Sequence, residues 1–492
     1  MKFYIVSIWL LFLTSIFGVS QADEISHDTQ LAWSQLTCDS KKLEPFLEHL
    51  PKGADLHCHV SGAVSTEILI KLAASNPYCI DADFNLTMMQ HNHCSTGEPT
   101  VVFFQEEKHR QQALKAWSIE QFAANDNEDK KTHFFNSFAK FEILVKQHQP
   151  EIIANVVQVA HEQNIQYLEL MLSLLEDKPN YTQLKMSDDI KLSQIKTVLA
   201  YPKVRKFVSK NIVYFKNLKS KVKEITPLSA QDVVLAWILE IKRNQPFDQF
   251  CLDAIQAFEI ANQVSDIAAI NLVQPEYAEY STQDYVKQMQ WLKVLKTHYP
   301  QIKLVLHAGE MPKDIKNAHI KQAMLIAKPL RIGHGTDIEN EVGYLSTLKL
   351  MRKKHIAVEV NLTSNDDVFG VKGSHHPLHL FMMSKVPVVL SSDDPGISRN
   401  KLSHEYWRAA HEHEFSLQQL LQVDRNSLSY SLLPGQSIWK NNECLTPVKA
   451  CRDFHSKSCI TFIAHNPKAY QQWLLEKRLA QYIKENLREG IA

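Results

Sequence analysis

The stretch GADLHCHVSGA, residues 53–63, contains the first of a series of short apolar runs that together predict the fold. A short apolar run here ends in His57-Cys58-His59. Successive side chains of a strand alternate between its two faces, so the two histidines point the same way and Cys58 points the other way. A shared face suits one metal ion held by two imidazoles, but two ordinary polar residues on a half-exposed strand give the same pattern. Other segments of the chain have to decide between these readings.

Seven further short runs, apolar and rich in β-branched residues, follow along the chain and alternate with longer helical stretches. Gly, Pro, Asn or Asp closes each run, as expected of strands. Strands that alternate with helices pair in parallel, and eight of them predict an α/β fold of the (β/α)8 TIM barrel type. The eight runs are ADLHCHV (54–60), IQYLELML (165–172), VVLAWILEI (233–241), IAAINLV (267–273), IKLVLHAGE (302–310), LRIGHGTD (330–337), HIAVEVNLTSN (355–365) and VPVVLSSDDPG (386–396).

Polar residues gather at the C-terminal ends of these runs. In a (β/α)8 barrel the active site lies at that end of the strands, so these side chains would converge on one mouth. A purely structural role gives no reason to place them all there, and the convergence favours a metal site. The residues concerned are His57, His59, His307, Glu310, His334, Asn365, Asp393 and Asp394.

Three neutral imidazoles and one carboxylate suit a borderline-soft divalent ion, and zinc is the first choice. We expect one Zn²⁺ per chain, with an open position for water. Zinc lowers the pKa of a bound water towards neutrality, which permits hydrolysis without a strong base. The expected ligands are His57, His59, His307 and Asp393.

Three further residues would then carry the catalytic roles. His334 is free to orient the water or to take its proton. Glu310, three residues beyond a ligand, is placed to act as an acid towards the substrate. Asp394, beside a ligand, is placed to accept a hydrogen bond from the substrate. The pattern predicts metal-assisted hydrolysis and leaves the leaving group open.

The composition excludes two classes of protein. Lys plus Arg equals Asp plus Glu at 54 each, whereas a nucleic-acid-binding or membrane-surface protein should show a basic excess. The hydrophobic fraction of 45% and the charged fraction of 22% are those of a soluble globular protein. A chain of 492 residues is long enough for one large domain or for two to three small ones.

The N-terminal segment predicts export. Residues 1–22 combine Lys2, an apolar run and small residues before Asp23, as in a cleaved secretory signal peptide. An uncleaved membrane anchor is the alternative, for which the apolar run is rather short. No later segment approaches a membrane span, so we expect a secreted or periplasmic protein with no membrane contact after cleavage. Residues 23–50 are expected to form a helical arm, and residues 51–492 the barrel domain.

Export makes disulfides plausible among the eight cysteines. Cys79 and Cys94 bracket a polar insertion at about 74–131, and we expect them to be joined. A second cluster, Cys444, Cys451 and Cys459, lies in a C-terminal extension at about 400–492, where the sequence alone does not give the pairing. Cys58 should be unpaired. Glycosylation sequons begin at Asn85, Asn180 and Asn361.

Several of these segments together match one family. PKGADLHCHVSGA, HAGE, RIGHGTD, EVNLTSN and SSDDPGIS resemble, in order and spacing, the signatures of the adenosine deaminase family of metal-dependent hydrolases. The resemblance covers about residues 51–400. HFFNSFAKF (133–141) also resembles the segment before that family's second strand. The signal peptide, arm and Cys79–Cys94 insertion look like the secreted adenosine-deaminase-related growth factor branch. That resemblance implies a homodimer formed through the arm, and the alternative for residues 23–50 is a helix packed on the bottom of the barrel.

The resemblance implies hydrolytic removal of the 6-amino group of adenosine or 2′-deoxyadenosine, with ammonia released. When the family's roles are assigned to the matching positions of this sequence, Glu310 would protonate purine N1, His334 would assist the attacking hydroxide and Asp394 would contact N7. The ligands would be those given above, binding zinc. The other zinc deaminase signature, His-x-Glu with Pro-Cys-x-x-Cys, is absent from the sequence, which argues against a cytidine-type enzyme.

Two departures from the family pattern concern the substrate. Ser61 stands where relatives commonly place an Asp against the ribose. Gln274, followed by Pro275, stands where relatives commonly place a Gly whose amide meets purine N3. We expect His59, Ser61, Gln274 and Asp394 to contact the substrate. Two alternatives stay open: an amidohydrolase acting on another aminopurine, such as adenine or a modified nucleoside, or a secreted binding or signalling protein with a vestigial site.

Overall fold

A computed structural model describes residues 26–120, 122, 129–174, 192–313, 315–441 and 445–488. Eight parallel strands stand at its centre, and each begins within or beside one of the eight predicted runs. They form two four-stranded sheets, ordered β1-β5-β6-β7 and β11-β10-β9-β8. The strands are β1 (Lys52–His59), β5 (Ile165–Ser173), β6 (Val234–Lys242), β7 (Ile267–Val273), β8 (Val305–Ala308), β9 (Arg331–His334), β10 (Ala357–Val360) and β11 (Val388–Leu390).

Two parallel β-bridges join the sheets into a ring. Ile270 pairs with Leu304 between β7 and β8, and Cys58 pairs with Asp393 at the other seam. At that second seam the His59 amide donates to the Asp393 carbonyl, and the Asp393 amide donates to the His57 carbonyl, both over 2.9 Å. The predicted (β/α)8 barrel is confirmed.

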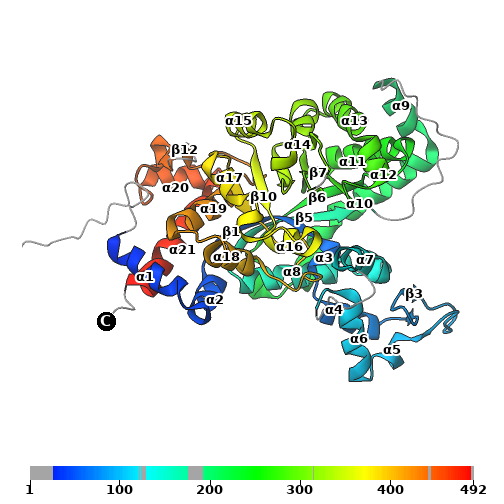
Figure 1. The fold of residues 1–492 in the computed structure, drawn as a ribbon. Coiled ribbons are helices and arrows are strands. Elements are labelled where there is room, and N and C mark those ends of the chain that lie inside the picture. The colour runs from blue at the N-terminus through cyan, green and yellow to red at the C-terminus, as the bar shows by residue number, and fades with distance from the viewer. Residues whose placement is uncertain are drawn as a thin grey trace, which may run out of the picture.

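Helices follow every strand and cover the outside of the ring (Figure 1). All eight residues of β1 are buried, because helices cover one face and barrel side chains fill the other. The main covering helices are α8 (Gln149–Glu162), α10 (Pro202–Ile225), α11 (Phe247–Gln263), α13 (Tyr285–His298), α15 (Tyr344–Lys354), α17 (Leu378–Met383) and α19 (Leu417–Ser429). Shorter ones are α9 (Leu192–Ala200), η1 (Leu228–Ala230), α12 (Glu279–Gln283), α14 (His319–Gln322), η2 (Ala323–Ala327), η3 (Ile338–Asn340), α16 (Leu362–Phe369) and η4 (Gly373–His375).

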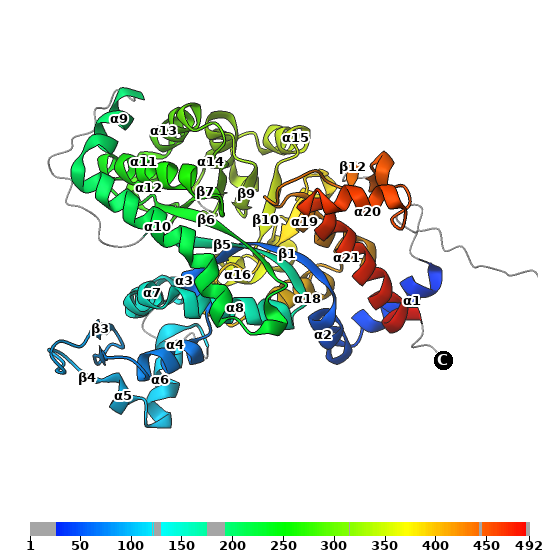
Figure 2. The same cartoon turned by 180° about the vertical axis from the view of Figure 1, so that it is seen from behind.

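The N-terminal arm consists of two helices, α1 (His27–Thr37) and α2 (Ser40–His49). α2 lies against α18 (Leu402–His411), and α1 lies against η6 (Lys484–Arg488), which directly follows α21 (Pro467–Ile483), as Figures 1 and 2 show. The Trp33 indole donates to the Phe415 carbonyl over 3.2 Å, and the Tyr482 hydroxyl donates to the Phe46 carbonyl over 2.8 Å. The arm therefore packs on its own barrel, and its use in a homodimer stays a prediction.

An insertion projects from the barrel between β1 and β5, next to α3 (Val60–Ala63) and α4 (Thr66–Ala74) (Figure 2). Its small antiparallel sheet has the order β3-β2-β4. The expected Cys79–Cys94 disulfide is present in it, and Cys58 is free and buried, as expected. Its elements, and the helix that leads back to the barrel, are β2 (Tyr78–Ile80), β3 (Leu86–Met88), β4 (Glu98–Pro99), α5 (Thr100–Phe103), α6 (Glu107–Trp117) and α7 (Lys130–Gln147).

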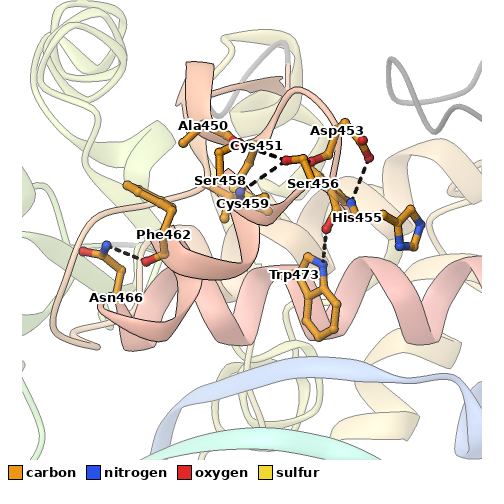
Figure 3. The surroundings of a disulfide bond; sticks show 12 residues. Ala450, Cys451, Asp453, His455, Ser456, Ser458, Cys459, Phe462, Asn466 and Trp473 are labelled. Carbon is orange, nitrogen blue, oxygen red and sulfur yellow. Dashed lines mark hydrogen bonds between the residues drawn. A yellow bond between two sulfur atoms is a disulfide. The ribbon is translucent and has the colours of Figure 1, made fainter.

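The C-terminal extension carries a second disulfide, Cys451–Cys459 (Figure 3). The bond ties η5 to α20, and the Ser458 hydroxyl donates to the Ala450 carbonyl over 2.8 Å beside it. Cys444 lies outside the described residues. The extension comprises β12 (Trp439–Asn441), β13 (Thr446–Pro447), η5 (Lys449–Cys451), α20 (Lys457–Ala464) and η6 (Lys484–Arg488), in addition to α18, α19 and α21.

The predicted signal peptide, residues 1–22, lies outside the described residues, as does the sequon at Asn180. Among the helices that the structure describes, none combines the length and apolar character of a membrane span. Asn361 is fully buried inside the barrel mouth, so its sequon is closed to a glycan in the folded protein. Asn85 is partly exposed and donates from its amide to Asp81.

Candidate metal centre and active site

The C-terminal ends of three strands bring the four predicted ligands together. His57 and His59 end β1, His307 lies in β8, and Asp393 lies three residues beyond the end of β11. His59 Nε2 lies 3.2 Å from His307 Nε2, and Asp393 Oδ1 lies 3.3 Å from His57 Nε2 and 3.4 Å from His59 Nε2. One donor atom from each of His57, His307, His334 and Asp393 lies within 4.8 Å of the others, and His59, Asp393 and Asp394 form a second such group.

Three of these imidazoles are held in the same way. Nδ1 of His57 lies 2.7 Å from the Glu359 carboxylate, and Nδ1 of His59 lies 2.7 Å from the Glu240 carboxylate. His307 Nδ1 lies 3.0 Å from the Asn271 carbonyl oxygen. That oxygen also accepts from the backbone amides of His307 and Leu272, which establishes it as the oxygen.

These contacts leave the Nε2 lone pairs free. An Nδ1–H that donates to an oxygen puts the lone pair of a neutral ring on Nε2, and a metal-bound histidine is oriented in this way. In the described part of the chain, His57 Nε2 is buried and has no hydrogen-bond partner. The three Nε2 atoms thus face one point as acceptors with no proton donor between them.

The spacing of the donor atoms fits a tetrahedral ion. Ligands at about 2.0–2.1 Å from zinc, in tetrahedral positions, lie about 3.3 Å from one another. The His59–His307, His57–Asp393 and His59–Asp393 separations given above span 3.2–3.4 Å. The cluster therefore fits a small divalent metal ion, with Asp393 supplying the charged ligand.

Small residues make room for this cluster. A Cβ at Gly62 would lie 1.9 Å from Asp394 Oδ1, and a Cβ at Gly333 would lie 2.7 Å from the His57 ring. Only glycine allows such close approach. Asp393 itself has a φ of +62° and His334 a φ of +64°, a region that non-glycine residues seldom occupy. Such strain is typical of functional sites.

Burial controls the charge of the acids beside the cluster. Burial, together with the charge of Asp393, raises the pKa of Glu310 to about 8, so this carboxyl keeps its proton at neutral pH. Burial and Asp393 also raise the pKa of Asp394. Burial works in the same direction on Glu359, but Arg331 and His57 outweigh it and lower the pKa of Glu359 to about 2.

Glu310 and His334 each have a defined support. The Gly309 and Glu310 amides donate to the carboxylate of buried Glu276 over 3.3 and 3.1 Å, which fixes the backbone from which Glu310 projects. His334 Nδ1 lies 3.0 Å from the Asn365 amide nitrogen, and its Nε2 lies 3.8 Å from Asp393 Oδ2. Burial lowers the pKa of His334 to about 3, which leaves the ring neutral.

A cavity of about 390 Å³ opens above the cluster. A purine nucleoside fits a space of this size. One wall is apolar and formed by α7, with Phe134, Phe135 and Phe138. Of the predicted substrate contacts and catalytic groups, those that line the cavity are His59, Ser61, Gln274, Glu310, His334 and Asp394.

Comparison with known proteins shows which proteins this chain resembles. The family model described as adenosine deaminase matches residues 227–441. An N6-mAMP deaminase from Arabidopsis thaliana is 25% identical over 371 residues, which are 73% of this chain and 86% of that protein. An adenosine deaminase from Aliivibrio fischeri is 31% identical over 142 residues, 28% of this chain and 41% of the other.

The chain is similar to the adenosine deaminase family, and its match to that family's model covers residues 227–441. A crystal structure of an amidohydrolase from Burkhoderia ambifaria with bound Zn has a TM-score of 0.51 at 14% identity, and the match covers 89% of this chain and 94% of that one. This likeness supports the barrel fold. The closer resemblance to the secreted growth factor branch stays a prediction.

Gln274 lies in the cavity wall, where a substrate contact is predicted. It has a φ of +82°, a backbone conformation that glycine adopts without strain. Its side-chain oxygen accepts from the Asn244 amide over 3.0 Å. The side chain is thus held by the neighbouring loop at the rim of the cavity.

Sequence reasoning did not single out the residues that orient the ligands. Glu240, Asn271 and Glu359 lie within predicted strands, each as a polar residue inside an apolar run: ILEI, AINL and AVEV. Glu359 also receives a hydrogen bond from buried Arg331. A polar residue at a fully buried strand position needs a partner, and that requirement is the signal that marks them.

Proposed function

We propose that the protein catalyses the hydrolytic deamination of adenosine and 2′-deoxyadenosine, giving inosine or 2′-deoxyinosine and ammonia. The observation that carries the proposal is one cavity that combines the metal-ligand cluster with Glu310, a carboxyl that is protonated at neutral pH. Deamination at purine C6 needs an acid at N1 and a water at C6, and these two requirements match the two features. The bound metal is proposed to be zinc, one ion per chain.

Glu310 supplies the proton that starts the reaction. Its transfer to purine N1 makes C6 electrophilic, and the water oxygen then forms a bond to C6 while the C6–N6 bond breaks. The water's two protons end on the departing ammonia and on Glu310, which replaces the proton given to N1. A bound zinc ion would supply the lowered pKa of the water. General acid catalysis of this kind contributes typically about 10²–10⁴-fold.

Asp394 and the apolar wall orient the purine. Asp394 Oδ1 is buried and, within the described residues, has no hydrogen-bond partner, so it is available to a substrate. Burial and the neighbouring Asp393 raise its pKa, which favours the protonated form that can donate to purine N7. Phe134 and Phe138 offer an apolar surface for the base. Each of these contacts would hold C6 over the ligand cluster.

Nucleoside 5′-monophosphates are a second candidate class of substrate, because two lysines line the same cavity. Lys146 Nζ lies 2.5 Å and Lys242 Nζ 3.6 Å from Glu142 Oε1, so two ammonium groups lie together at this wall. Ammonium groups in a cavity are suited to bind a phosphate. An N6-mAMP deaminase is among the relatives, and an N6-methyl substrate would release methylamine instead of ammonia.

One panel separates these candidates. Release of ammonia or methylamine is measured with adenosine, 2′-deoxyadenosine, adenine, AMP and N6-methyl-AMP. Highest kcat/KM for the two nucleosides supports the proposal. Highest kcat/KM for a nucleotide, reduced at least about tenfold in Lys146→Ala/Lys242→Ala, moves the assignment to the second class. No turnover of any compound by metal-loaded protein contradicts both assignments.

The location of the protein is proposed from its N-terminus. Residues 1–22 have the pattern of a signal peptide, and two disulfides within the described residues fit an oxidising compartment. We therefore propose a secreted or periplasmic enzyme. N-terminal sequencing of exported protein should begin at Asp23, and an intact Met1 in mature protein would contradict cleavage.

A further inference from the structure

We propose that Asn365 and His376 are positioning residues that fix the tautomer of His334, so that its Nε2–H faces the reacting centre as a hydrogen-bond donor. The catalytic part of this inference rests on the proposed hydrolytic reaction. The tautomer is a property of the protein alone and can be measured without any substrate. The tautomer and its catalytic role can therefore each be disproved without the other.

One donor beside His376 is certain, because it is a backbone amide. The backbone N–H of Leu378, at the start of α17, donates to His376 Nδ1 over 3.1 Å. A backbone amide can only donate, so Nδ1 must carry the lone pair, and a neutral ring then carries its hydrogen on Nε2. His376 is buried, and burial lowers its pKa well below the ordinary value, which keeps the ring neutral.

The next two contacts transmit this choice. His376 Nε2 lies 3.0 Å from Asn365 Oδ1, so the ring donates and the amide oxygen accepts. The amide nitrogen of Asn365 consequently faces the other way and lies 3.0 Å from His334 Nδ1. An amide nitrogen is a donor, which makes His334 Nδ1 the acceptor and places the ring hydrogen on Nε2.

Asn361 also approaches the ring, but it does not select a nitrogen. Its amide nitrogen lies 3.4 Å from Nδ1 and 3.4 Å from Nε2 of His334. Equal distances to both nitrogens mean that the amide lies across the ring and gives no preference to either. The chain through Asn365 therefore decides the tautomer.

His334 thus differs from the three ligand histidines, although it belongs to one 4.8 Å group with His57, His307 and Asp393. His57, His59 and His307 turn Nδ1–H towards oxygens and present Nε2 lone pairs to the metal position. The reversed tautomer of His334 has no lone pair to offer there. It is neither a fourth imidazole ligand nor a base for the water's proton in its neutral form, and it orients the attacking oxygen by donating to it.

The strongest test is Asn365→Asp, which replaces the hydrogen-bond donor at His334 Nδ1 by an acceptor. A carboxylate beside Nδ1 accepts a hydrogen, so His334 should move its hydrogen to Nδ1 and turn a bare Nε2 to the centre. A wrong histidine tautomer in a hydrolase costs up to about 10⁴-fold in turnover. We expect kcat to fall about 10²–10⁴-fold, with KM changed less than about threefold and bound metal unchanged. A kcat within threefold of wild type overturns the proposal.

A second pair of variants acts at the far end of the chain. His376→Phe keeps the ring volume and removes the donor, and we expect kcat to fall about 10- to 100-fold, as for other residues that orient a site group. His376→Gln restores an N–H donor and should recover kcat to within about threefold. Equal losses in Phe and Gln variants would show a packing role and overturn the proposal.

His413→Phe is the matched control. His413 is buried, its ring centre lies 5.8 Å from that of His376, and neither of its nitrogens has a hydrogen-bond partner in the described part of the chain. This change perturbs the same packing but leaves the hydrogen bonds from His376 through Asn365 to His334 intact, so kcat should stay within about twofold. A loss as large as that of His376→Phe would also assign the effect to packing.

The direct readout is the ¹⁵N spectrum of histidine-labelled, metal-loaded protein. The His334 resonance is assigned by its disappearance in His334→Gln. Wild type should show a protonated Nε2 and an unprotonated Nδ1, and Asn365→Asp should show the reverse. A wild-type spectrum with the hydrogen on Nδ1 overturns the proposal whatever the substrate proves to be.

Discussion

The inner and outer ends of the catalytic cavity differ in how completely they are constrained. At the inner end, buried oxygens hold Nδ1 of all three ligand histidines, and glycines leave no space for variation. At the outer end, Ser61 and Lys146 are only partly buried, and the Lys242 side chain is 43% exposed. The inner end carries the proposed metal and acid chemistry, and the outer end would select the molecule that undergoes it. The similarity to the adenosine deaminase family therefore supports hydrolase chemistry more firmly than any one substrate.

The largest effect is expected from a change at the inner end, His307→Ala. Loss of one of three imidazoles removes a metal ligand and leaves the Asn271 oxygen short of one hydrogen bond. We expect metal content below about a tenth of an ion per chain and activity at background, with the circular dichroism spectrum unchanged. Metal analysis alongside the assay checks this. Retention of a full equivalent of metal would break the assignment of the inner end.

Glu310→Gln keeps the shape of the inner end and removes its acid. We expect kcat to fall about 10²–10⁴-fold while the metal stays bound. Because the pKa of Glu310 is raised to about 8, the protonated form is present below that pH and is lost above it. Wild-type kcat should therefore fall tenfold per pH unit on the alkaline side, from pH 8 or lower, since a bound cation lowers this pKa.

Glu310→Gln should lose this alkaline limb. Rates measured between pH 5 and pH 10 for both proteins give the comparison. A mutant with near-normal turnover and the same limb would remove Glu310 from the mechanism.

Ser61→Asp changes the outer end, with a smaller effect. A carboxylate in the ribose region would add one charge-assisted hydrogen bond to a sugar hydroxyl, worth about 1.5–3 kcal/mol. We expect KM for adenosine to fall roughly 10- to 100-fold and kcat to change little. Ser61→Asn, which is similar in size and uncharged, is the control. An unchanged or raised KM in the Asp variant would place Ser61 outside the ribose pocket.

Gln274→Gly should have the smallest effect. A φ of +82° is strained for glutamine, whereas glycine adopts it freely but loses more entropy on folding. The two terms oppose each other, so we expect the free energy of unfolding to rise by no more than about 1 kcal/mol. Denaturant titration of the metal-loaded protein measures it. A clear loss of stability would show that the Asn244 contact outweighs the strain.

Much of this arrangement is predictable from the sequence because it depends on local patterns. The eight strands follow from apolar runs, and the polar residues at their ends follow from parallel order alone. The partners of the ligands do not. His57 and Glu359 are 302 positions apart, and no local pattern tells which buried glutamate meets which histidine. The pairing of Cys451 with Cys459 is likewise not predictable from local sequence, because distance in space decides which two of the three clustered cysteines join.

The seam between β1 and β11 that closes the barrel also determines when, during synthesis of the chain, the metal-ligand cluster can form. The ligands His57 and His59 bond through their backbones to Asp393, and next to them Asp55 bonds to Ser392, 337 positions later. At about 5–20 residues per second, a growing chain makes the two sides of this seam roughly 17–67 s apart. Until the second side exists, the early histidines lack their carboxylate, so the metal centre forms only after most of the polypeptide has been synthesised.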